Sequence, residues 1–125
     1  MKEKIRIEYI MNNVSMGILW NSIGTASGLS GWFADKVTAN DKIYTFEWGK
    51  SQQQAELICV RTGHHVRFHW CDDESKAYFE LKIIPDELTG DVALIVTDHA
   101  PADEKDDLIE LWNKQIKELK RKYGI

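Results

Sequence analysis

Near the start of the chain, apolar and charged residues alternate in the segment KIRIEYI, residues 4–10. Ile5, Ile7 and Tyr9 share one side of this alternation, and Arg6 and Glu8 fall on the other. A period of two residues is typical of a β-strand with one face in a core and one face in water. The pattern predicts a first strand over residues 2–10.

The next segment changes to the period of a helix. After Ser15, apolar residues recur at three- and four-residue spacing, namely Met16, Leu19, Trp20 and Ile23. Serine is favourable before a first helical turn because its hydroxyl accepts a hydrogen bond from a backbone N–H. We expect a short helix over residues 15–23 that ends at Gly24.

A second short helix is predicted directly after Gly24. Thr25 or Ser27 can cap it, and its apolar members are Leu29, Trp32 and Phe33. The aromatic pair is therefore expected on a helix rather than in a turn.

Six further short segments are rich in β-branched and aromatic residues. They read DKVTA, KIYTFEW, QQAELICV, HHVRFHWC, KAYFELKII and DVALIVTDH. Asn-Asp, Gly-Lys-Ser, Thr-Gly, Asp-Asp-Glu-Ser and Glu-Leu-Thr-Gly separate them, and these residue types favour turns. The succession predicts an antiparallel meander.

The last segment, residues 103–123, predicts one long helix. Acidic residues gather at its start and basic residues at its end, as the helix dipole favours. A stripe runs along one side, formed by Leu108, Leu111, Trp112, Gln115, Ile116 and Leu119.

Turn lengths predict which strand residues face each other. A two-residue turn at Thr62-Gly63 gives the pairs Arg61 with His64, Cys59 with Val66, Leu57 with Phe68 and Ala55 with Trp70. The loops DDES and DELT give Phe68 with Phe79, Val66 with Leu81, Leu81 with Leu94 and Phe79 with Val96. One face of the sheet is then apolar throughout.

The opposite face carries polar residues and is expected to be solvated: Glu56, His65, Arg67, His69, Tyr78, Glu80 and Lys82. An antiparallel sheet with one wet face needs a cover on the other, which the helices supply. The fold class is α+β, with seven strands, two short helices and a long C-terminal helix in a single domain over residues 1–125.

Charge and hydropathy exclude several classes of partner. The chain of 125 residues has a net charge of −4, whereas nucleic-acid binding depends on clustered cations. The longest apolar run, VALIV, is too short to span a bilayer, and the start has no apolar segment of signal-peptide length. We expect a cytoplasmic protein with no nucleic-acid or membrane partner.

Metal-binding and catalytic residues are not predicted. His65, His69 and Cys71 share a strand face, but His65 and His69 would lie roughly 13 Å apart, too far to share an ion. Asp98 and His99 are adjacent in a strand and so point to opposite faces. The apolar face offers only Cys59 and Tyr44 as polar chemistry, with Cys59 a small core residue. We therefore predict no catalytic site, metal or cofactor.

A disulfide is not expected either. The register places Cys59 on the inner face and Cys71 on the outer one, whereas a bridge needs converging side chains.

The order of elements, together with two motifs, resembles a known superfamily. The segment SMGILWNSIGTASGLSGWFADKV is similar to a pattern ending in Leu-x-x-Trp-Phe-Ala-Asp, here Leu29, Trp32, Phe33, Ala34 and Asp35. The whole chain resembles the START-like, birch-pollen-allergen-like (SRPBCC) superfamily, whose helix-grip fold is a curved sheet with the long helix on its concave face.

One strand points to a branch of that superfamily. HHVRFHW resembles the Arg-Leu-Val-Phe-x-Trp strand of the branch related to the activator of Hsp90 ATPase, with Val66, Phe68 and Trp70 at the matching places. Two features depart from it: the later strand has only GDVALIV where Gly-Thr-x-Leu is usual, and the terminal helix lacks a Gly-Trp start.

The resemblance implies a cavity between sheet and helix. Its expected wall is Trp32, Phe33, Phe46, Leu57, Phe68, Trp70, Phe79, Leu81, Leu94, Leu108 and Trp112. Three functions stay open: non-enzymatic binding of a small apolar ligand, a chaperone-related protein-interaction module with a side-chain-filled interior, and an enzyme. The shortage of polar groups on the inner face favours binding over catalysis.

Overall fold

The computed structural model describes residues 2–12 and 14–124, and within them seven antiparallel strands form one sheet in the order β1-β7-β6-β5-β4-β3-β2. The strands are β1 (Lys2–Met11), β2 (Lys36–Asn40), β3 (Ile43–Trp48), β4 (Ser51–Arg61), β5 (His65–Trp70), β6 (Phe79–Pro85) and β7 (Val92–Pro101). The helices are α1 (Met16–Gly24), α2 (Ala26–Leu29), the 3-10 turn η1 (Ala102–Glu104) and α3 (Lys105–Tyr123).

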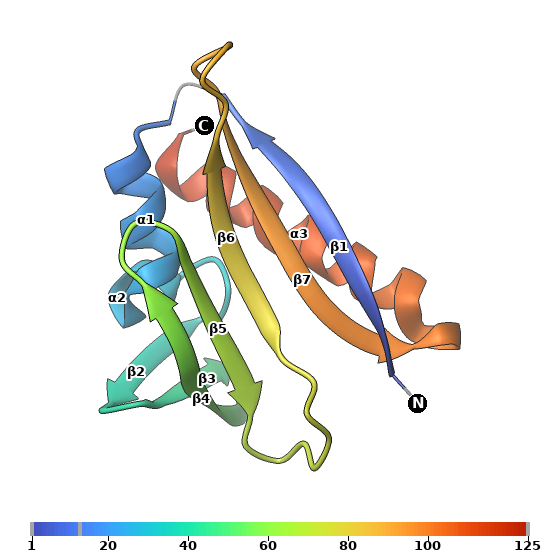
Figure 1. Ribbon diagram of the computed structural model, residues 1–125. Coiled ribbons are helices and arrows are strands. Elements are labelled where there is room, and N and C mark those ends of the chain that lie inside the picture. The colour runs from blue at the N-terminus through green and yellow to red at the C-terminus, as the bar shows by residue number, and fades with distance from the viewer. Residues whose placement is uncertain (1, 13, 125) are drawn as a thin grey trace.

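The sheet is curved and α3 packs across its concave face (Figure 1). Strand β1 pairs with β7 along its whole length, from Lys2 opposite Pro101 to Met11 opposite Val92. The remaining strands pair with their neighbours in the sequence. The predicted helix-grip architecture is confirmed.

The two short helices begin where their capping residues predicted. Ser15 Oγ accepts a hydrogen bond from the Ile18 backbone N–H at 3.1 Å, and Thr25 Oγ1 accepts one from Gly28 at 2.9 Å. These bonds satisfy N–H groups that a first helical turn leaves without a partner.

The aromatic pair does not lie on the second helix, so that prediction was wrong. Helix α2 ends at Leu29, and Trp32 and Phe33 occupy the turn that follows it. Ser30, in an extended conformation, ends the helix. Gly31 begins the turn with a φ of 92°, a conformation that glycine adopts without strain. Both aromatic side chains are nevertheless buried.

The predicted register of β4 and β5 is correct for half of its length. Leu57 faces Phe68 and Ala55 faces Trp70, but the pairs Cys59–Val66 and Arg61–His64 are wrong. A bulge after Leu57 shifts the register by one residue, and the turn contains three residues instead of two. The shift aligns Cys59 with Arg67 on the outer face. Cys59 is therefore exposed and is not the predicted core residue.

Strands β6 and β7 are displaced by two residues from the predicted register. Leu81 faces Val96 and not Leu94, because the connecting loop has six residues instead of four. Within it, the Asp86 backbone N–H donates to the Asp91 carbonyl at 2.8 Å. A shift by an even number of residues keeps each side chain on its face, so Phe79, Leu81 and Leu94 remain buried as expected.

The predicted pairs of β5 with β6, Phe68–Phe79 and Val66–Leu81, are confirmed.

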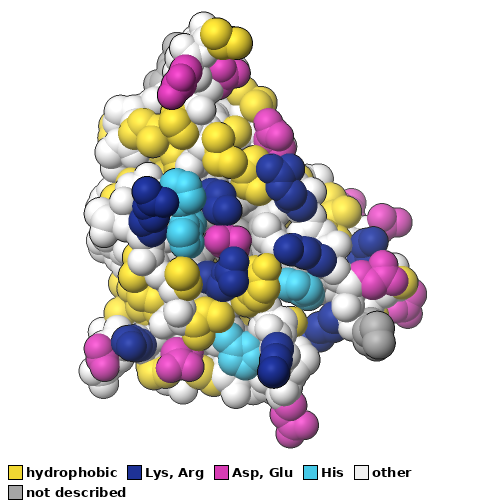
Figure 2. Space-filling view, viewed as in Figure 1, with side chains coloured by type: hydrophobic (Ala, Val, Ile, Leu, Met, Phe, Trp, Pro, Cys, Tyr) yellow, Lys and Arg dark blue, Asp and Glu magenta, His cyan; other side chains and the backbone are white. Residues whose placement is uncertain are grey.

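The outer face of the sheet is polar but not uniformly solvated. Figure 2 shows basic and histidine side chains gathered on this face. Glu80, predicted to be wet, is only 5% exposed. Arg67 covers it, with Nη2 3.4 Å from Glu80 Oε2 and the guanidinium 4.0 Å above the Tyr78 ring. The longer side chain of Arg67 thus shields the Glu80 carboxylate from water.

Helix α3 is the cover that the sheet requires. Trp112, Ile116 and Leu119 are buried along its inner side, whereas Leu111, a member of the predicted stripe, is 52% exposed. Polar contacts also hold the helix: Tyr9 on β1 donates from its hydroxyl to Asn113 Oδ1 at 2.6 Å. The helix ends at Tyr123 and is capped by Gly124, which has a φ of 68°.

Shortening a buried side chain of α3 should destabilise the whole domain. Ile116 is 2% exposed, so Ile116→Ala should lower the free energy of unfolding by about 2–5 kcal/mol through lost burial and the cavity left behind. The neighbouring exposed variant Lys117→Ala should change it by less than about 0.5 kcal/mol. Urea unfolding followed by circular dichroism measures both, and equal effects would contradict packing of α3 on the sheet.

Candidate functional site

A pocket of about 420 Å3 lies between α3 and the sheet. Its wall draws on β3 to β7, on α3 and on the turn after α2, and consists of Phe33, Trp48, Gln53, Trp70, Phe79, Asp98, Leu108, Leu111, Trp112 and Gln115. Phe33, Phe79 and Trp112 are buried at its base. Trp48, Trp70 and Leu111 are partly or well exposed, and so form a rim accessible from solvent.

Phe33 is the centre of the aromatic base. Its ring centroid lies 5.4 Å from that of Phe79 in a stacked arrangement and 5.6 Å from that of Trp112. On its other side it meets Phe46 edge-on at 5.1 Å. Ring pairs at these separations are favourable beyond the area that they bury, and they make the base rigid.

The backbone of Phe33 is held as firmly as its ring. Its carbonyl oxygen accepts hydrogen bonds from Trp48 Nε1 at 3.0 Å and from Gln115 Nε2 at 2.9 Å. Trp48 belongs to β3 and Gln115 to α3, so this oxygen joins the sheet, the helix and the turn. Two residues of the pocket wall thereby have fixed side-chain positions.

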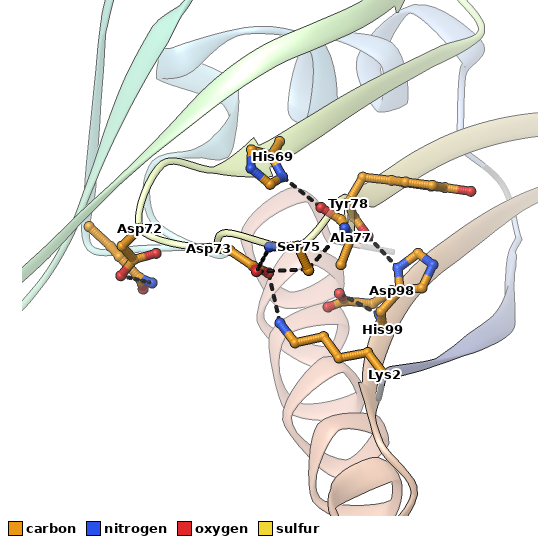
Figure 3. Close-up of polar contacts among 10 residues, drawn as sticks. Lys2, His69, Asp72, Asp73, Ser75, Ala77, Tyr78, Asp98 and His99 are labelled. Atoms are coloured by element: carbon orange, nitrogen blue, oxygen red, sulfur yellow. Dashed lines mark hydrogen bonds and ion pairs between the residues drawn. The ribbon is translucent and has the colours of Figure 1, made fainter.

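Among the described residues of the wall, Asp98 is the ionisable group. Its Oδ1 accepts a hydrogen bond from the His99 backbone N–H at 2.7 Å (Figure 3). Its Oδ2 accepts one from Trp112 Nε1 at 2.9 Å. Burial nevertheless raises the pKa of Asp98 above its ordinary value of 3.8. The carboxyl is therefore less well solvated in the folded protein than in water.

The predicted cavity wall and the observed pocket overlap in part. Five predicted residues line the pocket: Phe33, Trp70, Phe79, Leu108 and Trp112. The other six lie in or against the core beside it and are not among its lining residues: Trp32, Phe46, Leu57, Phe68, Leu81 and Leu94.

The sequence reasoning missed the polar part of the wall. It expected only Cys59 and Tyr44 as polar chemistry on the inner face, whereas Asp98, Gln53 and Gln115 line the pocket. The alternation along β7 contained the signal, because Asp98 follows Leu94 and Val96 at two-residue spacing and so shares their inward face.

A chain of polar contacts near Asp98 holds the loop between β5 and β6 (Figure 3). Lys2 Nζ lies 2.7 Å from Asp73, and Asp73 Oδ1 accepts from the Ser75 backbone and hydroxyl. These hydrogen bonds lower the pKa of Asp73. His69 and His99 donate from Nδ1 to the carbonyls of Ala77 and Tyr78. The two histidines thus have structural partners.

Neither cysteine forms a disulfide, since Cys59 and Cys71 are both free and exposed. Among the described residues, no three or more His, Cys, Asp or Glu side chains are grouped to hold a metal ion. No helix within residues 2–12 and 14–124 is long and apolar enough to cross a membrane.

Comparisons with known proteins extend over the whole chain. A family model described as START-like superfamily domain matches residues 1–125. The solution structure of BfR322 from Bacteroides fragilis is 50% identical, with a TM-score of 0.71, and the match covers 99% of this chain and 93% of that one. No match was found among curated proteins.

Two more distant structures share the fold. Aha1 from Colwellia psychrerythraea, solved as a dimer, is 12% identical with a TM-score of 0.73, covering 96% of this chain and 93% of that one. DynU16, from the dynemicin biosynthetic locus, is 15% identical with a TM-score of 0.82, covering 97% of this chain and 47% of that one. At these identities the likeness concerns the fold alone.

The raised pKa of Asp98 gives its contribution to stability a definite pH dependence. The folded state binds a proton at a higher pH than the unfolded chain does, so this contribution falls as pH rises through the interval between the two pKa values. The unfolding free energy of the native protein should therefore increase relative to that of Asp98→Asn as the pH is lowered toward 3.8. Urea titrations at several pH values measure this difference.

Asp41→Asn makes the same chemical change at an exposed position in the turn between β2 and β3, and it is the control for the loss of a carboxylate. Asp73 contributes with the opposite sign, but equally to all three proteins. A difference for Asp98→Asn that stays constant or reverses over the interval would contradict burial of the carboxyl.

Proposed function

The chain belongs to the START-like superfamily, and we propose that it is a non-enzymatic domain that binds a small, largely apolar ligand in the pocket beneath α3. The observation that carries the proposal is the pocket itself, about 420 Å3 in volume with mostly aromatic and aliphatic walls. Ligand sites commonly have volumes of roughly 300–1,000 Å3 and walls of this composition.

The base and rim of the pocket suit different parts of such a ligand. The base of Phe33, Phe79 and Trp112 is buried and rigid, so it can receive an apolar body without reorganising. A preformed site loses less conformational entropy on binding. Trp48, Trp70 and Leu111 lie at the accessible rim, where a ligand can enter.

A second candidate is a protein-interaction module, as the resemblance to the Hsp90 ATPase activator branch implies. Exposed apolar side chains at the far end of the sheet favour it. Ile10 and Ile84 flank Ala93 and are 47% and 40% exposed, and Leu88 in the next loop is 97% exposed. Apolar patches of this kind occur at protein contacts. This surface is separate from the pocket, so the two functions can be tested independently.

Filling the pocket should block binding without disturbing the core. Leu111 lines the pocket yet is 52% exposed, so Leu111→Trp can place an indole over the rim at little cost in stability. A hit from a panel of fatty acids, sterols and neutral aromatic dyes should bind Leu111→Trp at least about tenfold more weakly than the native protein, a difference of about 1.4 kcal/mol.

Tryptophan emission and the ligand-dependent rise in melting temperature measure this affinity, since a ligand selective for the native state stabilises it. Lys114→Trp is the matched control, because Lys114 is exposed on α3 and is not among the lining residues. Its affinity should equal that of the native protein. A panel without any hit would favour the interaction module.

A further inference from the structure

The wall of the pocket combines many aromatic faces with a single ionisable group. Five of its described residues carry aromatic rings: Phe33, Trp48, Trp70, Phe79 and Trp112. Its polar members are two glutamines and Asp98. Among the described lining residues, none is a lysine, arginine or histidine. The pocket therefore presents π faces and one carboxylate with no cationic side chain in its wall.

The carboxylate of Asp98 keeps acceptor capacity for a ligand. Each oxygen accepts one hydrogen bond, from Trp112 Nε1 and from the His99 backbone N–H. A carboxylate offers about four lone-pair positions, so about two remain. The two bound donors are an indole and an amide, which are neutral, so they leave the negative charge unbalanced.

The basic side chains near Asp98 have other partners. Lys2 lies outside the pocket wall with Nζ 2.7 Å from Asp73, and the His99 ring donates to the Tyr78 carbonyl (Figure 3). Both residues act to lower the pKa of Asp98, but burial raises it by more. A positive charge placed inside the pocket would supply the compensation that these neighbours do not.

We propose that the pocket selects a ligand that carries a positively charged nitrogen on an apolar body, such as a primary amine or a quaternary ammonium. The nitrogen would lie against Asp98 and the tryptophan faces, since cations bind favourably over indole rings. The inference rests on the proposed function, because it names the class of ligand for the same pocket. The net charge of −4 favours the approach of a cation.

Three probes of one shape and different charge test the proposal: naphthylethylamine, naphthylethanol and naphthylpropanoate. At neutral pH they are a cation, a neutral molecule and an anion. Isothermal titration calorimetry should show the amine binding about tenfold more tightly than the alcohol, as a close charge pair and a cation–π contact together predict. The propanoate should bind most weakly.

Removing the carboxylate should remove the selectivity. In Asp98→Asn the amine and the alcohol should bind with affinities within about threefold of each other. Glu110→Gln makes the same change in net charge at an exposed position of α3 outside the lining residues. This control should keep the full preference for the amine.

A measurement on the native protein covers the case in which Asp98→Asn does not fold. The indole N–H resonance of Trp112 reports on its hydrogen bond to Asp98, so the amine should shift it in a two-dimensional NMR spectrum more than the alcohol does at equal occupancy.

The outcomes separate this inference from the proposed function. Equal affinities for amine and alcohol in the native protein, a preference for the propanoate, or an amine preference that survives in Asp98→Asn would overturn the charge selectivity and leave apolar binding intact. Failure of all three probes to bind would count against both.

Discussion

The turn at Phe33 is the contact on which the rest of the structure depends. Its carbonyl oxygen receives hydrogen bonds from Trp48 on β3 and Gln115 on α3, and its ring packs between Phe46 on the sheet and Trp112 on the helix. Helix, sheet and turn are therefore fixed relative to one another at one point. The pocket is formed around that point, so its base inherits the rigidity of the core.

Asp98 shows how the fold accommodates a charge at the edge of an apolar interior. The indole N–H of Trp112 donates to the carboxylate, so the one hydrogen bond gives a partner both to a buried donor and to a buried acceptor. Burial still raises the pKa of the acid. A site that retains an incompletely compensated carboxylate beside aromatic faces has a chemical preference that a fully apolar cavity would lack.

Proteins with little sequence identity to this chain share its fold. Aha1 and DynU16 share the arrangement of sheet and helix with this chain at 12% and 15% identity. The same architecture therefore forms from very different sequences, because many sequences satisfy one pattern of buried positions. Function then depends on the few residues that reach the pocket or the exposed sheet end.

From the sequence one can predict the order of elements, the helix caps at Ser15 and Thr25, and the face on which most strand residues lie. These features follow from local periodicity and short-range hydrogen bonds. The predicted register was wrong beyond the bulge after Leu57, where one extra residue turns Cys59 outward. Such a bulge depends on how two strands twist against each other, which no single strand encodes. Only the folded chain shows which apolar residues fill the core and which border the pocket. That division depends on where α3 comes to rest on the sheet, and therefore on contacts between residues as distant in sequence as Phe33 and Gln115.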